Sequence, residues 1–167
     1  MFAPLWDMTY HSPSPPPASI PVNYHAHFAV TLRLAHTRDD LLVRHVRLLR
    51  DCVGLAQQRW EFTIEAAAVL PSEVQLLCRF QDANYGVQQS LRMITTTFER
   101  HLPTSEGDIW GNQHEVIKIS PAVAALRKTF IEAAPVRAGL VNNPRDWPYS
   151  SAHVDTLQSM NMGVSVA

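Results

Sequence analysis

The stretch from Val69 to Phe80 constrains the fold most strongly, because its polar and apolar residues alternate after a Pro-Ser turn. Such alternation is typical of a β-strand with two different faces. One face carries Val74, Leu76, Cys78 and Phe80, and the other carries Glu73, Gln75, Leu77 and Arg79. If the apolar face packs into a core, Glu73 and Gln75 project together from the opposite face. Either that face is an ordinary solvated face, or a helix covers it or a site uses it.

Three further strand-like segments and two long helical patterns accompany this strand. The strands are expected at residues 23–34, 59–68 and 116–119, and the helices at residues 37–54 and 84–102. The order strand, helix, strand, strand, helix, strand is that of the split βαβ unit. The chain is therefore predicted to be α+β, with a ferredoxin-like antiparallel sheet and two helices on one face.

Residue spacing gives more local expectations. The first long helix should end at Gly54 or just before it. One side of the second strand should carry Trp60, Phe62, Ile64 and Ala66. An extra C-terminal helix should begin at Ser120, a capping residue followed by Pro121, and run to about Ala133. Its core side would carry Val123, Leu126, Phe130 and Ile131.

Length and composition predict one domain at residues 23–153, which needs no disulfide to bury a core. Residues 1–22 are rich in proline and are expected to form a disordered arm, and residues 154–167 a loose tail. No apolar run approaches a membrane span, and no secretory signal is visible, so a cytoplasmic location is expected. The net charge of −1 argues against binding to nucleic acid mainly through phosphate neutralisation, but leaves room for a basic patch.

Two neighbouring segments near the C-terminus carry a resemblance to a known family. Residues 130–141 read Phe-Ile-Glu-Ala-Ala-Pro-Val-Arg-Ala-Gly-Leu-Val, and residues 144–151 read Pro-Arg-Asp-Trp-Pro-Tyr-Ser-Ser. They resemble the REP-associated tyrosine transposases, whose motif reads Tyr-Ile-Glu-x-Asn-Pro-Val-Arg-Ala-Gly, with a Ser-Ser further on. Ala134 replaces the Asn of that motif. The family belongs to the single-strand transposases with a His-hydrophobe-His nuclease site, and the resemblance covers roughly residues 23–153.

The resemblance implies a metal-dependent transfer of DNA strands. In the family, a divalent metal, Mg²⁺ or Mn²⁺, is held by the two His of Asn-His-Val-His and polarises the scissile phosphate. A Tyr, expected here on the second long helix, attacks phosphorus and forms a 5′-phosphotyrosyl link. Basic and polar residues hold a folded single-stranded hairpin.

This chain departs from the pattern at the residues that carry the chemistry. The metal motif is replaced by Ser-Glu-Val-Gln-Leu-Leu, so Glu73 and Gln75 stand at the two ligand positions as a degenerate pair. Alignment on Phe98 puts Ile94 or Thr95 at the Tyr position, and no Tyr occurs between Gly86 and Leu102. No catalytic residue is therefore assigned, and no metal is expected unless the protein is active.

A rebuilt site is an alternative. His25 and His27 on the first strand also have His-hydrophobe-His spacing and would put both rings on one face. Tyr24 or Tyr85 would then have to be the nucleophile. Both histidines also have an ordinary interpretation as residues of a sheet face.

The candidate DNA contacts are Arg92, Arg100 and Arg137. Arg137 is equally suited to anchoring a chain reversal, and Trp110 and Trp147 are expected to pack rather than to stack on bases. The leading hypothesis is a catalytically degenerate, transposase-like protein that binds single-stranded hairpin DNA. An active metal-dependent nuclease with a displaced site, and a module that binds a protein partner or forms a homodimer, are the alternatives.

Overall fold

The computed structural model describes residues 26–37, 40–81, 86–103, 108–112 and 114–153. The elements are β1 (Ala26–Arg33), α1 (Leu41–Arg44), α2 (Val46–Trp60), β2 (Phe62–Val69), β3 (Glu73–Phe80), α3 (Gly86–His101), β4 (Glu115–Ile119), α4 (Ala124–Glu132) and α5 (Ala134–Arg137), with short 3-10 helices at Pro121–Val123 and Pro144–Asp146. The expected arm at residues 1–22 and tail at residues 154–167 lie outside the described residues. In the described part, no helix has both the length and the apolar character of a membrane span.

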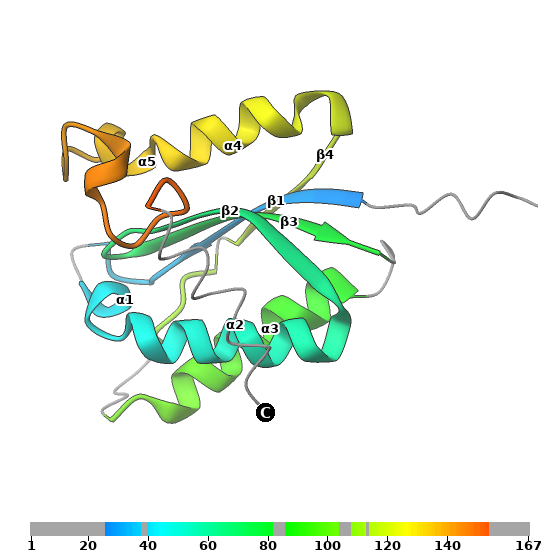
Figure 1. The fold of residues 1–167 in the computed structure, drawn as a ribbon. Coiled ribbons are helices and arrows are strands. Elements are labelled where there is room, and N and C mark those ends of the chain that lie inside the picture. The colour runs from blue at the N-terminus through cyan, green and yellow to red at the C-terminus, as the bar shows by residue number, and fades with distance from the viewer. Residues whose placement is uncertain (1–25, 38–39, 82–85, 104–107, 113, 154–167) are drawn as a thin grey trace, which may run out of the picture.

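The four strands form one antiparallel sheet in the order β2-β3-β1-β4. Helices α2 and α3 cover one face, and α4 crosses the other (Figure 1). The prediction of an α+β, ferredoxin-like sheet with two helices on one face and an extra C-terminal helix is therefore confirmed. Because β1 and β3 pair in the centre, Arg33 lies opposite Glu73 and Thr31 opposite Gln75.

The main core lies between the sheet and the helices α2 and α3. Phe80 stacks on Phe62 with ring centroids 4.6 Å apart and meets the edge of Phe28 at 5.9 Å. Helix α3 buries the residues that its spacing predicts, Val87, Leu91, Ile94 and Phe98. The predicted apolar face of β3 is confirmed in the same cluster, by Val74, Leu76, Cys78 and Phe80.

A β-bulge in strand β2 changes which residues point toward the main core. The register shifts between Ile64 and Ala66, so that one extra residue, Glu65, enters the strand. Ile64 faces the main core, but Ala66 belongs to the smaller cluster under α4. The expectation that Ala66 shares a side with Phe62 and Ile64 is therefore wrong, because a bulge inverts the alternation of the residues that follow it.

Helix α2 continues past Gly54 to Trp60, so the expected end at Gly54 is also wrong. Gly54 is buried inside the helix, and the turns after it are held by the buried residues Ala56 and Gln57. The Gln57 amide donates a hydrogen bond to the Phe62 carbonyl oxygen across the end of the helix. The helix ends at Trp60, and the next residue, Glu61, has a left-handed backbone with φ of 39°.

The predicted cap at Ser120 forms, because its hydroxyl accepts a hydrogen bond from the Ala122 N–H, but it starts the 3-10 helix Pro121–Val123, and α4 itself begins at Ala124. The expected core side is mostly wrong. Ile131 is buried, whereas Leu126 is 72% exposed and Phe130 49% exposed. The helix meets the sheet over small residues, and this second cluster comprises Ala29, Ala66, Ala68, Leu70, Leu77, Ile119, Ile131 and Ala134.

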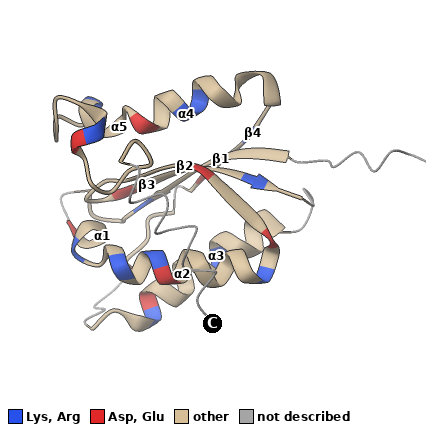
Figure 2. Cartoon of the chain, in the orientation of Figure 1, with Lys and Arg blue, Asp and Glu red and all other residues tan. Residues whose placement is uncertain are grey.

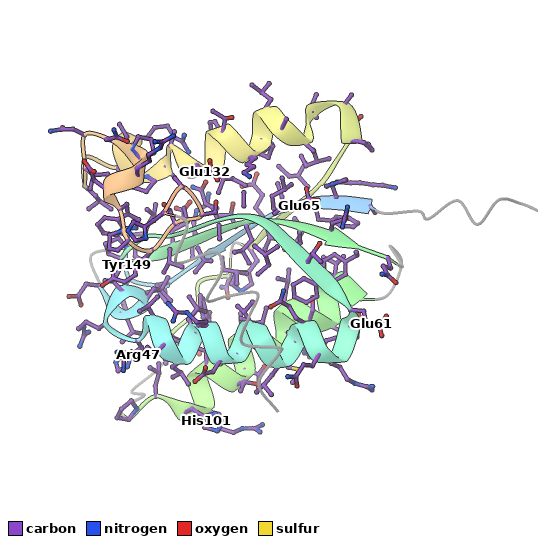
Figure 3. The ribbon with its side chains drawn as sticks, viewed as in Figure 1. Arg47, Glu61, Glu65, His101, Glu132 and Tyr149 are labelled. Carbon is purple, nitrogen blue, oxygen red and sulfur yellow. The ribbon has the colours of Figure 1, made fainter. Side chains whose placement is uncertain are left out.

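The segment after α5 returns to the outer edge of β2. Val69 donates its N–H to the Tyr149 carbonyl oxygen, and the Trp147 indole donates to the Val69 carbonyl oxygen at 2.9 Å. Ser151 exchanges hydrogen bonds with Ala67, and its hydroxyl donates to the Glu132 carboxylate on α4 at 2.7 Å. Figure 3 labels Glu132 and Tyr149 on the two sides of this contact. The Trp-Pro-Tyr-Ser-Ser sequence thus fastens α4 to the sheet.

The two cysteines are buried thiols of the core, and we expect both to resist alkylation. Burial, with a smaller effect of nearby carboxylates, raises the pKa of Cys52 from 9.0 to about 11 and that of Cys78 to about 12. The thiolate is the reactive form, so at pH 8 the Cys52 thiolate is about 100-fold scarcer than in a free thiol. Iodoacetamide followed by mass spectrometry should find both unmodified without urea and both modified in urea. Equal labelling under the two conditions contradicts the burial.

Candidate functional site

Glu73 and Gln75 face α4 at one end of the sheet, where their side chains are hydrogen-bonded to each other. The Gln75 amide donates to Glu73 Oε1 at 2.6 Å. The other oxygen, Glu73 Oε2, lies 3.4 Å from Arg33 Nε on the paired strand. Arg33 also reaches the Glu115 carboxylate of β4, with Nη2 and Oε2 3.7 Å apart. The two degenerate ligand positions therefore belong to an ion-pair network that spans β3, β1 and β4.

This network does not fit a divalent metal ion. Mg²⁺ and Mn²⁺ need several oxygen ligands turned toward one point. Here both oxygens of Glu73 are engaged, and the Arg33 guanidinium would repel a dication beside it. Among the described residues, no group of three or more His, Cys, Asp and Glu side chains is placed to hold a metal.

The sheet separates Glu73 and Gln75 from the residues that alignment places at the Tyr position. Ile94 is 1% exposed and packs into the main core, on the α2 and α3 face. Thr95 lies beside it on α3, where its hydroxyl donates to the Arg92 carbonyl oxygen. Neither side chain can reach the opposite face, so the structure does not bring the proposed metal and nucleophile positions together.

Phe130 on α4 is the aromatic residue that does share a cavity with Gln75. A cavity of about 410 Å³ lies between α4, α5 and the sheet, and we call it the α4 pocket. Its lining includes Thr31, Arg33, Gln75, Glu115, Arg127, Phe130 and Arg137. The family motif has Tyr at the position of Phe130, so the ring on this face lacks the phenolic hydroxyl.

Two arginines flank the Phe130 ring. The Arg137 guanidinium carbon lies 3.8 Å from the ring centroid, and that of Arg127 lies 5.4 Å from it. Arg137 also donates to the Phe130 carbonyl oxygen, which ties α5 back to α4. The hydrogen bond supports the expectation that Arg137 anchors a chain reversal. Arg137 also lines the α4 pocket, so it remains a candidate DNA contact.

His27 lies on the same face of the sheet but away from Gln75. Its Nε2 is 3.1 Å from the Glu65 carboxylate, which also lies 3.6 Å from Arg79 Nε. His27 pairs with Arg79, four residues along β3 from Gln75, or about 13 Å in a strand. His25, Tyr24 and Tyr85 lie outside the described residues. The described part of the rebuilt site is therefore a histidine bound to a carboxylate.

Arg92 and Arg100 lie on α3, across the sheet from Arg137 (Figure 2). Arg92 lines a separate cavity of about 390 Å³ with Gln88, Gln89, Leu91, Thr95 and His114. Burial lowers the pKa of His114 there. The three candidate DNA contacts therefore do not form one surface.

The two tryptophans are anchored by their indole N–H groups. Trp110 donates to the Thr95 carbonyl oxygen at 3.1 Å and packs against Phe98 at 5.5 Å. Trp147 donates to Val69, as described above. Both contacts agree with the expected packing roles.

Sequence reasoning did not assign to a site five residues of the α4 pocket: Thr31, Arg33, Glu115, Arg127 and Phe130. The signal for Phe130 was present, because the motif that carries the resemblance has Tyr at this position. Arg127 lies three residues before Phe130, which is one turn of helix. Arg33 gave no local signal, since only strand pairing brings it to Glu73.

Comparison with known proteins places these features in context. No protein-family model matches the chain. A Haemophilus influenzae protein named as a REP-associated tyrosine transposase is 26% identical over 140 residues, covering 75% of this chain and 78% of that relative. The structure of a REP-associated tyrosine transposase bound to a REP hairpin aligns with a TM-score of 0.71 and 22% identity over 81% of each chain. A transposase crystal structure from Deinococcus radiodurans aligns with a TM-score of 0.48 and 16% identity, covering 65% of this chain and 90% of that chain. The resemblance in sequence and the fold are both confirmed.

Proposed function

Since the chain is a relative of the REP-associated tyrosine transposases, we propose that it binds single-stranded hairpin DNA and does not cleave it. Phe130 carries this proposal, because it stands at the motif's Tyr position and lines the α4 pocket together with the former ligand position Gln75. We infer from this placement that the family's nucleophile corresponds to Phe130 and not to Ile94 or Thr95 on α3. A phenyl ring has no oxygen with which to attack phosphorus. The protein would thus have kept the transposase fold while losing the nucleophile.

The ion-pair network supports the loss of the metal step as well. Glu73 and Gln75 bond to each other, and Arg33 brings a positive charge to the place where the family holds its cation. In this proposal the protein needs neither Mg²⁺ nor Mn²⁺. The missing nucleophile and the missing ligands are two independent defects on one face of the sheet.

The charge of the C-terminal segment supports nucleic acid as the partner. Residues 120–153 contain four basic residues, Arg127, Lys128, Arg137 and Arg145, against two acidic ones, Glu132 and Asp146, within a chain of net charge −1. Figure 2 shows basic positions on α4 and α5. We place the DNA on this side of a cytoplasmic protein, as a folded hairpin like that bound in the solved relative.

Binding and cleavage are tested on the same oligonucleotide. Purified full-length protein is mixed with a fluorescent REP-type hairpin and Mn²⁺, and is analysed on a native gel and on a denaturing gel. We expect a complex that weakens with rising salt on the native gel, because phosphate contacts release counterions. On the denaturing gel we expect no covalent adduct and no shortened strand.

The two gels separate the hypotheses. An adduct would show that a nucleophile survives, and replacement of Tyr24, Tyr85 or His27 would then locate the displaced site. Absence of any salt-sensitive complex with hairpins would remove the DNA-binding proposal.

A second candidate function is a protein-interaction surface, favoured by the exposed apolar residues Val123 and Leu126 near the start of α4. Ile117 of β4 is also exposed. Such a surface could take a protein partner or a second copy of the chain. Sedimentation of the protein alone tests the homodimer: a mass of two chains that Leu126→Glu reduces to one would support this function.

A further inference from the structure

The α4 pocket has positive charge that the protein itself does not neutralise. Arg33 is balanced by Glu73 and Glu115. By contrast, Arg127 and Arg137 have no carboxylate within ion-pair distance among the described residues. The two guanidinium groups converge on one ring, since both lie within 6 Å of the Phe130 centroid. The pocket is therefore suited to an anion.

The shape and donors of the pocket define the class of anion. A guanidinium has five N–H donors in a planar fork that matches the oxygens of a phosphate group. Of the hydrogen bonds that Arg137 can donate, the described structure uses one, to the Phe130 carbonyl oxygen. The volume of about 410 Å³ exceeds that of a single phosphate group and accommodates the attached sugar.

We infer that the α4 pocket binds a nucleotide phosphate through Arg127 and Arg137 without a metal ion. This inference deepens the proposed function and rests on it for the identity of the ligand as DNA. Charge-assisted hydrogen bonds from the two arginines replace the attraction that a dication would supply. The Phe130 ring holds both arginines by cation-π contact and forms the apolar wall of the pocket.

Arg33 has a positioning role in this arrangement. Glu115 in the lining of the pocket, and Glu73 beside the lining residue Gln75, would repel a phosphate there if their charges were not balanced. Arg33 lies between the two carboxylates and neutralises part of that charge. Metal-free binding therefore depends on Arg33 as well as on the two arginines that contact the ligand.

The test measures hairpin binding by fluorescence anisotropy in EDTA and in Mn²⁺. We expect equal affinity under the two conditions, and an affinity about 10- to 100-fold lower for Arg127→Gln/Arg137→Gln in both. The matched control, Arg47→Gln/Arg59→Gln, removes two arginines from α2 on the opposite face and should change affinity by less than about threefold. Circular dichroism confirms that each variant is folded. If binding is lost in EDTA, or if the two double variants have equal effects, the inference of a metal-free phosphate pocket is overturned. The proposal that the protein binds hairpin DNA still stands, because the complex in Mn²⁺ remains.

A small probe separates this inference from the proposed function. Thymidine 5′-monophosphate is titrated into labelled protein in EDTA, and the side-chain Nε–H signals of the arginines are followed by NMR. We expect shifts at Arg127 and Arg137 and none at Arg92. If these shifts occur but no hairpin binds, the pocket assignment stands and the DNA-binding proposal fails. If no arginine of the pocket shifts, the pocket assignment fails.

The role of Arg33 has its own readout. Arg33→Gln should weaken hairpin binding, and a second change, Glu73→Gln, should restore it by removing the unbalanced carboxylate. A purely structural role for Arg33 predicts no such rescue. Failure of Glu73→Gln to restore binding would therefore remove Arg33 from the inference.

Discussion

Replacing Ile94 with Tyr is expected to lower the free energy of unfolding by about 2 to 5 kcal/mol and to give no DNA cleavage. Ile94 is almost wholly buried in the main core, so a larger ring must displace its neighbours. The added hydroxyl would also be buried without a partner, which costs about 1 to 3 kcal/mol. Urea denaturation followed by circular dichroism measures the loss as a shift of the midpoint.

Phe130→Tyr is the matched control, because it adds a hydroxyl at the position that faces the α4 pocket. Phe130 is half exposed, so this change should alter stability by less than about 0.5 kcal/mol. The altered protein should still form no covalent adduct, since the residues around Gln75 do not fit a metal. A stable Ile94→Tyr protein that attacks a hairpin would show that the nucleophile belongs on α3.

Ser151→Ala is expected to destabilise the protein by about 1 to 3 kcal/mol. The Ser151 hydroxyl accepts from the Ala67 N–H at 3.1 Å and donates to the Glu132 carboxylate at 2.7 Å. Alanine leaves the buried Ala67 N–H and the half-buried Glu132 carboxylate without this hydrogen bond, and an unpaired buried polar group costs more than the bond itself contributes. Thermal and urea unfolding provide the measurement.

Thr129→Ala serves as the control for Ser151. The Thr129 hydroxyl is exposed and donates only within its own helix, to the Ala125 carbonyl oxygen. Its removal should change stability by less than about 0.5 kcal/mol. Equal and small effects of the two changes would mean that the C-terminal segment does not fasten α4 to the sheet.

The sequence predicted best those elements in which all apolar residues of the pattern pack into the same core. Helix α3 packs one stripe into the main core, so the spacing of Val87, Leu91, Ile94 and Phe98 identified both the helix and its buried face. The β2–β3 hairpin followed from the Pro-Ser turn between two alternating segments. In both cases local pattern and tertiary packing agree, which is the condition for reliable inference.

The predictions of which residues are buried failed where the packing depends on contacts between distant segments and not on the local sequence pattern. Nothing in the residues around Glu65 marks a bulge, because the extra residue is defined only by the pairing of β2 with β3. The apolar residues Val123 and Leu126 suggested a buried face on α4. That helix instead crosses a sheet face of small residues and buries chiefly Ile131.

The candidate site was predicted in part. The alternation of β3 correctly placed Glu73 and Gln75 opposite the core, and the C-terminal motif gave the family. The choice of α3 for the nucleophile rested on alignment at Phe98, which does not tell which face of a sheet a helix covers. Only the crossing of α4 brings Phe130 to the pocket that Gln75 lines.

The docking of the C-terminal segment along β2 also limits how copies of this protein could join through their sheets. Tyr149 and Ser151 occupy the backbone groups at the end of β2, and the remaining free portion is interrupted by the bulge after Ile64. Within the described structure, β4 is the other outer strand of the sheet. Head-to-tail addition of strands, which has no natural end, is thereby disfavoured. If two copies of the chain did join by their sheet edges, the described structure would leave β4 against β4, a symmetric pairing of two chains.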